Sequence, residues 1–126
     1  LIGVGKMVEA ALAAAEELGR RGVSVTVWDP RAVKPLDRAM LTDAARHRVV
    51  ITAEDGLRAG GVGMSMIDDI RRICGAENRP APRNEVLGVP TEFLPHGDPD
   101  EILASFGLDA AGMIAAVERA DQRTIC

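Results

Sequence analysis

Apolar residues follow two different spacings along this chain, and each change of spacing marks a predicted element. Residues Leu1 to Val4 form a short apolar run, which indicates the end of a buried strand. Over residues 6–20 apolar side chains recur every three or four positions, which predicts a helix with one buried face. From Val23 to Trp28 valines alternate with polar residues, and this period of two predicts a strand.

The rest of the chain continues as an alternation of helices and strands. Asp37, Asp98 and Asp109 each stand at the capping position before a helical pattern, where a carboxylate accepts from free backbone N–H groups. The elements expected after Asp37 are a helix at 38–45, a strand at 48–52, a helix at 64–74, a strand at 85–89, and helices at 99–105 and 110–120.

This alternation predicts an α/β fold, a three-layer αβα sandwich with a mostly parallel sheet of about five strands. A length of 126 residues suits one such domain, and neither an internal repeat nor a linker divides it. We therefore expect residues 1–126 to form a single domain. Since the chain opens inside a predicted strand and without Met, we expect it to be part of a longer protein.

Charge and composition exclude several classes of partner. The net charge of −4 argues against nucleic acid and against an anionic membrane, because both need a basic surface. No apolar run approaches the roughly 20 residues that span a bilayer, so we expect a cytoplasmic protein. Cys74 and Cys126 lack the spacing of a metal or redox site and are too few for a disulfide framework.

The glycine-rich segment from residue 54 to residue 63 is the strongest local candidate for chemistry. It follows a predicted strand, at the edge where open α/β sheets bind ligands. Gly60, Gly61 and Gly63 precede a helix, so their N–H groups could hold an anion. Glu54 and Asp55 could serve as acid and base, or could be solvated or contact a neighbouring loop. A structural loop or domain contact is the favoured interpretation, because no complete catalytic set accompanies the pair.

Three other patterns carry weaker hypotheses. The glycines at 3 and 5 resemble part of a dinucleotide fingerprint, but Val8 stands where the third glycine belongs. His96 lies in a loop bounded by Gly and Pro and is a candidate for facing a substrate, without an evident base partner. Cys74 could pair with His96 only if its thiol were exposed, and its place on an apolar helical stripe predicts burial.

Four sequence segments, in order along the chain, resemble motifs of a known family. Two of these segments resemble motifs of the transketolase C-terminal domain. Residues 27–37 resemble its D-x-R-x-V-K-P-L-D motif, and residues 52–63 resemble its T-x-E-[ED]-x…G-G-x-G loop. These two phrases also suit the β subunits of 2-oxoacid dehydrogenases. Residues 87–97 and 106–113 are similar to the G-[LI]-P-x-x-F-x-x-H-G and L-G-L-D-A-x-G-[IM] segments of 1-deoxy-D-xylulose-5-phosphate synthases. The chain thus resembles the C-terminal domain of that synthase family.

Two residues depart from the family pattern within the glycine-rich segment. Gly56 stands where the family often has Asn, and Met64 stands where a Ser commonly follows the G-G-x-G phrase. Both changes weaken the expectation that a side chain of this segment contacts an active site.

The resemblance implies a thiamine-diphosphate enzyme that decarboxylates pyruvate and joins the remainder to glyceraldehyde 3-phosphate. It also implies that upstream domains hold the cofactor and Mg²⁺, while this domain packs against them and supports a homodimer. No catalytic, cofactor-binding or metal-binding residue is then expected in this chain, which lacks the G-D-G metal motif. The candidates for an interdomain or active-site-facing loop are Glu54, Asp55, Gly60, Gly61, Gly63 and His96.

Two alternatives remain open at this point. One is the C-terminal domain of a transketolase or of a 2-oxoacid dehydrogenase β subunit. The other is a standalone α/β protein that binds an anion at the glycines or serves as an interaction module. In each case we expect Gly61→Val to damage folding or docking more than chemistry, because a β-branched side chain is poorly tolerated where the backbone needs glycine.

Overall fold

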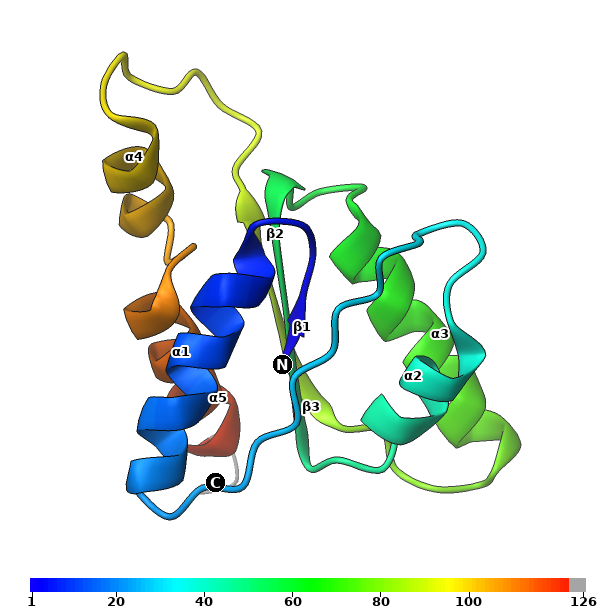
Figure 1. Ribbon diagram of the computed structural model, residues 1–126. Helices are drawn as coiled ribbons and strands as arrows, with labels where there is room; N and C mark the ends of the chain where they lie inside the picture. Colours follow the sequence, from blue (N-terminus) through cyan, green and yellow to red (C-terminus); the bar gives the residue numbers. More distant parts are fainter. Residues whose placement is uncertain (123–126) are drawn as a thin grey trace.

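A parallel sheet lies at the centre of the molecule, between two layers of helices (Figure 1). The computed structural model describes residues 1–122. The strands pair in the order β1-β2-β3, and both pairings are parallel. Their bounds are Ile2–Gly3 for β1, Val49–Leu57 for β2 and Arg83–Val89 for β3. The predicted α/β class is confirmed, but the sheet has three strands and not about five.

Helices cover both faces of the sheet, which confirms the three layers. On one face lie α1 (Met7–Arg20) and α5 (Ala110–Gln122), with α4 (Pro99–Ser105) in the same layer; on the other lie α2 (Arg38–Ala44) and α3 (Val62–Ala76). Successive residues of β2 point to opposite faces: Ile51 packs in the core under α1 and α5, and Val50 in the core under α2 and α3. Both faces are apolar, as expected of a parallel sheet.

The three predicted helix caps are confirmed. Asp37 accepts the N–H of Ala39 at 2.7 Å, and Asp98 accepts that of Asp100 at 2.9 Å. Asp109 accepts the N–H of Gly112 at 2.7 Å. Each carboxylate satisfies a donor that the first helical turn leaves free, so the three helices begin where the sequence predicts.

The expected strand from Val23 to Trp28 forms only at its last residue. Trp28 bridges Ile2 in parallel, and its N–H donates to the carbonyl oxygen of Leu1 at 2.9 Å. A strand needs a neighbour for its N–H and C=O groups. Within residues 1–122 no strand lies beside residues 23–25, despite their strand-like sequence.

Strand β2 extends five residues further than expected. The bulge between Ala53 and Leu57 lets the strand resume pairing with Val89, after which the N–H of Arg58 donates to the carbonyl oxygen of Val89 at 2.9 Å. Helix α3 correspondingly begins at Val62, two residues before the predicted start. The expected long glycine loop is therefore a strand end, a tight connection and a helix start.

The described residues include no candidate membrane helix, and the one cysteine among them is buried. Within residues 1–122 no helix combines the length and apolar character needed to cross a membrane. Cys74 is buried in the core under α2 and α3, and its Sγ contacts the carbonyl oxygen of Ala45 at 3.7 Å, as the apolar stripe predicted. Cys126 lies outside the described residues.

Candidate functional site: the glycine-rich edge of the sheet

Glu54 is a buried carboxylate at the carboxyl end of the sheet. Its side chain is held under the start of α3, and the residue is only 6% exposed. Its Oε1 accepts the N–H of Gly63 at 3.0 Å, in the first turn of the helix. A negative charge at this position complements the partial positive charge of the helix N-terminus. Glu54 thereby supplies the cap that Gly61, which precedes the helix and has no side chain, cannot provide.

Glycine is required at two positions by close approach of other atoms. A Cβ on Gly61 would overlap the carbonyl oxygen of Leu57 and Oε1 of Glu54. A Cβ on Gly63 would overlap Oγ1 of Thr52. Gly61 and Gly63 thus let the start of α3 lie directly on the end of β2, which explains the second and third glycines of the G-G-x-G segment in this chain.

Two of the three N–H groups expected to hold an anion, those of Gly60 and Gly63, already have partners inside the chain. That of Gly63 donates to Glu54, and that of Gly60 contacts Sδ of Met64 at 3.4 Å. The carboxylate of Glu54 occupies the place an external anion would take, and its charge would repel one. The structure brings Glu54, Gly61 and Gly63 together as a packed corner.

Asp55 and His96 stand apart from this corner. Glu54 is buried and Asp55 is exposed, so the two adjacent carboxylates do not share one environment. His96 is exposed in the segment 90–98, which projects beyond the same end of the sheet (Figure 1). Among residues 1–122 no hydrogen bond or ion pair joins His96 to the glycine-rich corner. An acid–base pair is therefore not assembled here by this chain alone.

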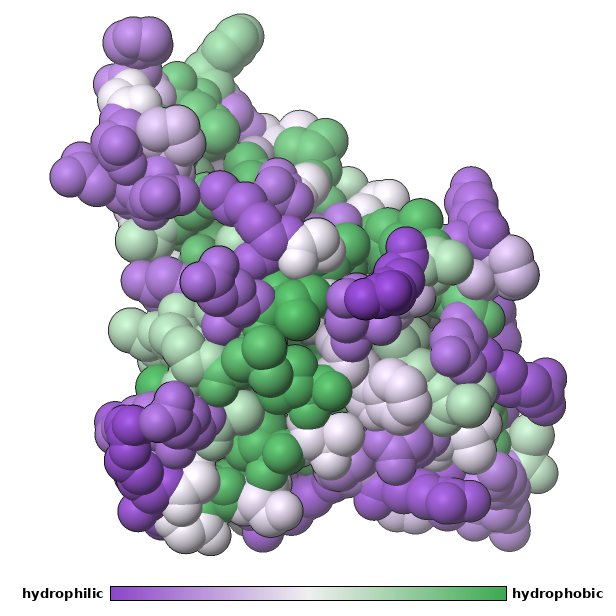
Figure 2. Space-filling view, viewed as in Figure 1, coloured by the Kyte–Doolittle hydropathy of each residue, from purple (hydrophilic) through white to green (hydrophobic). Residues whose placement is uncertain are grey.

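Large apolar side chains are exposed around the same end of the sheet. Phe93 is fully exposed and Leu94 is 42% exposed in the projecting segment. Leu57 ends β2 and Met64 lies in the first turn of α3, and both are about half-exposed. Figure 2 shows apolar surface among the polar groups of this upper part of the molecule. Four large apolar side chains are thus exposed near one end of the sheet.

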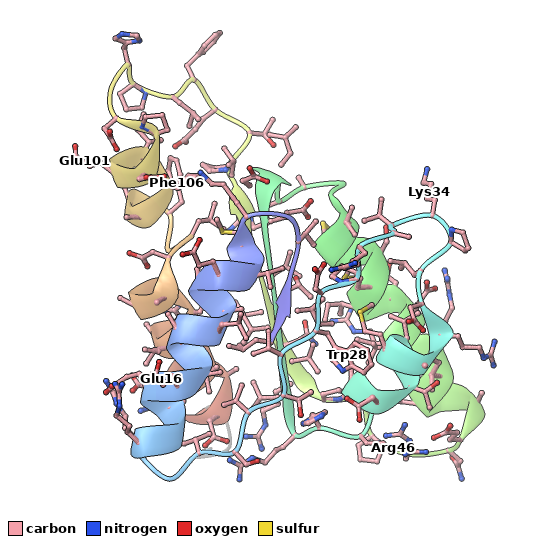
Figure 3. The ribbon with its side chains drawn as sticks, in the orientation of Figure 1. Glu16, Trp28, Lys34, Arg46, Glu101 and Phe106 are labelled. Atoms are coloured by element: carbon pink, nitrogen blue, oxygen red, sulfur yellow. The ribbon has the colours of Figure 1, made fainter. Side chains whose placement is uncertain are left out.

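A second polar cluster was not predicted from the sequence. The indole N–H of Trp28 donates to Oδ2 of Asp43 at 2.7 Å, and Nε2 of His47 lies 3.5 Å from the same oxygen. The hydrogen bond from Trp28 is the main cause that lowers the pKa of Asp43, while burial opposes this shift and the proximity of His47 adds to it. Trp28 lies beside α2 in Figure 3, so the bond fixes the preceding segment to that helix. A half-buried Trp needs an acceptor, which is the signal that could have revealed it.

The residues present do not fit a metal–diphosphate site. Within residues 1–122 no three His, Cys, Asp or Glu side chains come together in a way that could hold a metal ion. The one buried acidic side chain near the glycines is already engaged with Gly63. We therefore assign no step of a cofactor reaction to this chain.

The layered sheet and the packed glycine corner define an α/β domain with exposed apolar side chains at the carboxyl edge of its sheet. The sequence profile described as "Transketolase, C-terminal domain" matches residues 1–113, which is most of the chain. The chain belongs to the transketolase C-terminal domain family.

Several curated relatives are 1-deoxy-D-xylulose-5-phosphate synthases. A 1-deoxy-D-xylulose-5-phosphate synthase of Kocuria rhizophila is 46% identical over 110 residues, and one of Paenarthrobacter aurescens is 47% identical over 110 residues. Each alignment covers 87% of this chain and 16% of the relative. A 1-deoxy-D-xylulose-5-phosphate synthase 2 of Kitasatospora griseola is 41% identical over 118 residues, covering 94% of this chain and 18% of the relative. The resemblance to the C-terminal domain of this synthase family is confirmed, and the chain spans about a sixth of these relatives' length.

A solved structure supports the fold. It is described as a split gene transketolase, inactive β4 tetramer, and superposes with a TM-score of 0.76 at 32% identity. The superposition covers 94% of this chain and 36% of that chain. The similarity extends over both helical layers, since it includes nearly the whole chain.

Proposed function

We propose that this chain is the C-terminal domain of a thiamine-diphosphate-dependent 1-deoxy-D-xylulose-5-phosphate synthase, a cytoplasmic transferase that condenses decarboxylated pyruvate with glyceraldehyde 3-phosphate to feed isoprenoid synthesis. The observation that carries the proposal is the 46–47% identity over 110 residues to proteins of that name. The matched region includes the His96-Gly97 and Leu108-Asp109 phrases that distinguish these synthases within the superfamily.

Within that enzyme the domain serves assembly rather than chemistry. Its buried corner of Glu54, Gly61 and Gly63 is a rigid support, and its exposed apolar edge is the surface that packs on the upstream domains. Thiamine diphosphate and Mg²⁺ belong to those domains, and the whole enzyme is a homodimer. Asp55, Gly60 and His96, which are exposed at this edge, are the residues placed to face another domain.

A transketolase-type enzyme is the second candidate. The solved structure described as a split gene transketolase supports it, because it shares the fold at 32% identity. The two candidates differ in their acceptor chemistry. The synthase consumes pyruvate with release of carbon dioxide, whereas a transketolase moves a two-carbon unit between sugars.

The deciding experiment uses the whole protein that contains this chain. Sequencing the reading frame upstream of Leu1 shows whether a G-D-G…N metal motif precedes it. The purified protein is then assayed with pyruvate and glyceraldehyde 3-phosphate, and in parallel with ketose donors and no pyruvate. Pyruvate-dependent product with carbon dioxide release supports the synthase. Activity only with ketose donors supports the transketolase, and a frame that begins within a few residues of Leu1 contradicts both.

The 126-residue chain by itself is expected not to bind thiamine diphosphate. The reason is that residues 1–122 offer no cluster of metal ligands, and the N-terminus of α3 is occupied by Glu54. Titration calorimetry with thiamine diphosphate and Mg²⁺ checks this, with Mg²⁺ alone as the control. Micromolar binding that depends on Mg²⁺ would contradict the assignment of the cofactor to upstream domains.

Charge introduced at the apolar edge is expected to weaken assembly of the whole protein. Phe93→Asp places a carboxylate on a fully exposed aromatic position, so the folded domain itself should lose less than about 0.5 kcal/mol of stability. If Phe93 packs on an upstream domain or partner subunit, the same change weakens that contact at least tenfold, about 1.4 kcal/mol. Sedimentation of the whole protein measures this loss of assembly. Leu12→Asp on α1, 57% exposed, is the matched control, and equal effects of both variants would refute the assigned surface.

A further inference from the structure

Met64 is the exposed methionine of this domain. The chain has five methionines, and Met64 is 46% exposed, whereas each of the others is at most 4% exposed, namely Met7, Met40, Met66 and Met113. Met66 lies two residues further along α3 and is buried in the core under α2 and α3. Five thioethers of the same intrinsic chemistry thus differ in their access to solvent, and a buried one meets a dissolved reagent only when the structure opens locally.

The thioether of Met64 is held in place beside the glycine-rich corner. Met64 lies in the first turn of α3, and its Sδ accepts the N–H of Gly60 at 3.4 Å. Sulfur is a weak acceptor, and a thioether carries two lone pairs. The bond to Gly60 uses one of these lone pairs, so the other remains available to react.

We propose that Met64 is a modification site, at which hydrogen peroxide converts the thioether to a sulfoxide and thereby weakens packing at the apolar edge of the domain. A sulfur lone pair attacks one peroxide oxygen, so that an S–O bond forms and the O–O bond breaks. The other oxygen leaves as water after taking up a proton. The sulfur loses two electrons and the peroxide gains them. Methionine sulfoxide reductases reverse this change, so the modification can be undone.

The fold can accommodate a sulfoxide at Met64. This side chain belongs to neither of the two apolar cores, so oxidation leaves no polar group in the interior. The new oxygen is a stronger acceptor than sulfur, and the N–H of Gly60 already points at this side chain. A sulfoxide at Met66 would instead place a polar group in a core, at a large cost in stability. We therefore expect oxidation of Met64 to leave the domain folded.

Oxidation changes the chemistry of the exposed apolar edge, which Leu57, Met64, Phe93 and Leu94 form. A polar sulfoxide must lose its water when another surface packs on it, and this loss weakens the contact unless a donor replaces the water. Packing would in turn cover Met64, so the reaction belongs to protein whose edge is uncovered. The effect on assembly rests on the proposed function, whereas the selectivity of the reaction rests on the exposure of the methionines alone.

Peptide mapping by mass spectrometry after treatment with hydrogen peroxide tests the selectivity. The 126-residue chain carries Cys126→Ser, so that the thiol outside the described residues consumes no peroxide. We expect sulfoxide to form at Met64 at least about tenfold faster than at Met66, because Met66 must wait for local opening. Met64→Leu removes the sulfur and keeps an apolar side chain, and total sulfoxide formation should then fall to the slow rate of the buried methionines. Equal rates at Met64 and Met66 would overturn the proposed site.

Met64→Gln in the whole protein tests the effect on assembly, because Gln has a similar length and carries a polar oxygen, as the sulfoxide does. We expect it to weaken assembly at least about threefold in sedimentation, and Met64→Leu to leave assembly unchanged. Equal assembly of the two variants would overturn the proposed effect. Neither measurement uses pyruvate or a cofactor, and the selectivity test needs only this chain. Failure of the proposed reaction is therefore distinguishable from failure of the modification site.

Discussion

Gly61→Val is expected to lower the free energy of unfolding by about 3 kcal/mol or more, at or above the upper end of the usual cost of overpacking. Gly61 is in an ordinary extended conformation, so the cost comes from close approach and not from backbone strain. A side chain there would overlap the carbonyl oxygen of Leu57 and the carboxylate of Glu54. The backbone of β2 cannot move aside as a flexible side chain can, so the start of α3 must shift. Urea denaturation followed by circular dichroism measures the loss.

Gly75→Ala is the matched control for this substitution. It adds a Cβ to a glycine of the same helix that has no atom within 4 Å of the new position. It should therefore stabilise the protein by about 0.5–1 kcal/mol through helix propensity. If the free energy of unfolding of Gly61→Val stays within about 1 kcal/mol of that of the parent chain, the close packing assigned to Gly61 is wrong. In the whole protein, normal stability and assembly with loss of the proposed activity would instead show a direct role in chemistry.

Glu54→Ala is expected to cost about 2–4 kcal/mol, because it removes a charge-assisted hydrogen bond and leaves a cavity. The N–H of Gly63 would lose its acceptor in a place from which water is excluded. Glu54→Gln keeps the shape of the side chain and an acceptor oxygen and loses only the charge. We therefore expect it to lower the free energy of unfolding by about 1 kcal/mol, the size of a charge–dipole interaction at a helix end. Thermal and urea unfolding of both variants separates the two contributions.

Asp55→Ala gives the control, because Asp55 is the adjacent carboxylate and is exposed. It should change stability by less than about 0.5 kcal/mol. A larger loss for Asp55→Ala than for Glu54→Ala would reverse the roles assigned to the two acids. In the double variant Glu54→Ala with Gly61→Val, the losses should be less than additive, because one of the two overlapping groups is gone.

Helix positions were predictable from the sequence because their causes are local. Asp37, Asp98 and Asp109 act on N–H groups two or three residues away, and the apolar stripes have the period of the helix itself. The phrases at 27–37, 52–63, 87–97 and 106–113 likewise sufficed to predict the family, which the match over residues 1–113 bears out.

The candidate site could be predicted only in part. The sequence placed glycines and paired acids after a strand, and the glycine-rich edge is indeed where they lie. It could not show that Glu54 turns inward to cap α3 while Asp55 stays in solvent. The direction of each side chain depends on the bulge in β2, and that bulge depends on pairing with β3, some thirty residues further along the chain.

What the sequence by itself determined is therefore the helices, their caps, the layered α/β class and the family. What only the tertiary structure decided is the length of each strand and the partner of each buried polar group. Residues 23–25 have a strand sequence and yet form no strand, because within residues 1–122 no neighbouring strand offers partners for their backbone groups. Helices satisfy their backbone within one segment, whereas strands and buried carboxylates need groups that distant parts of the chain must supply.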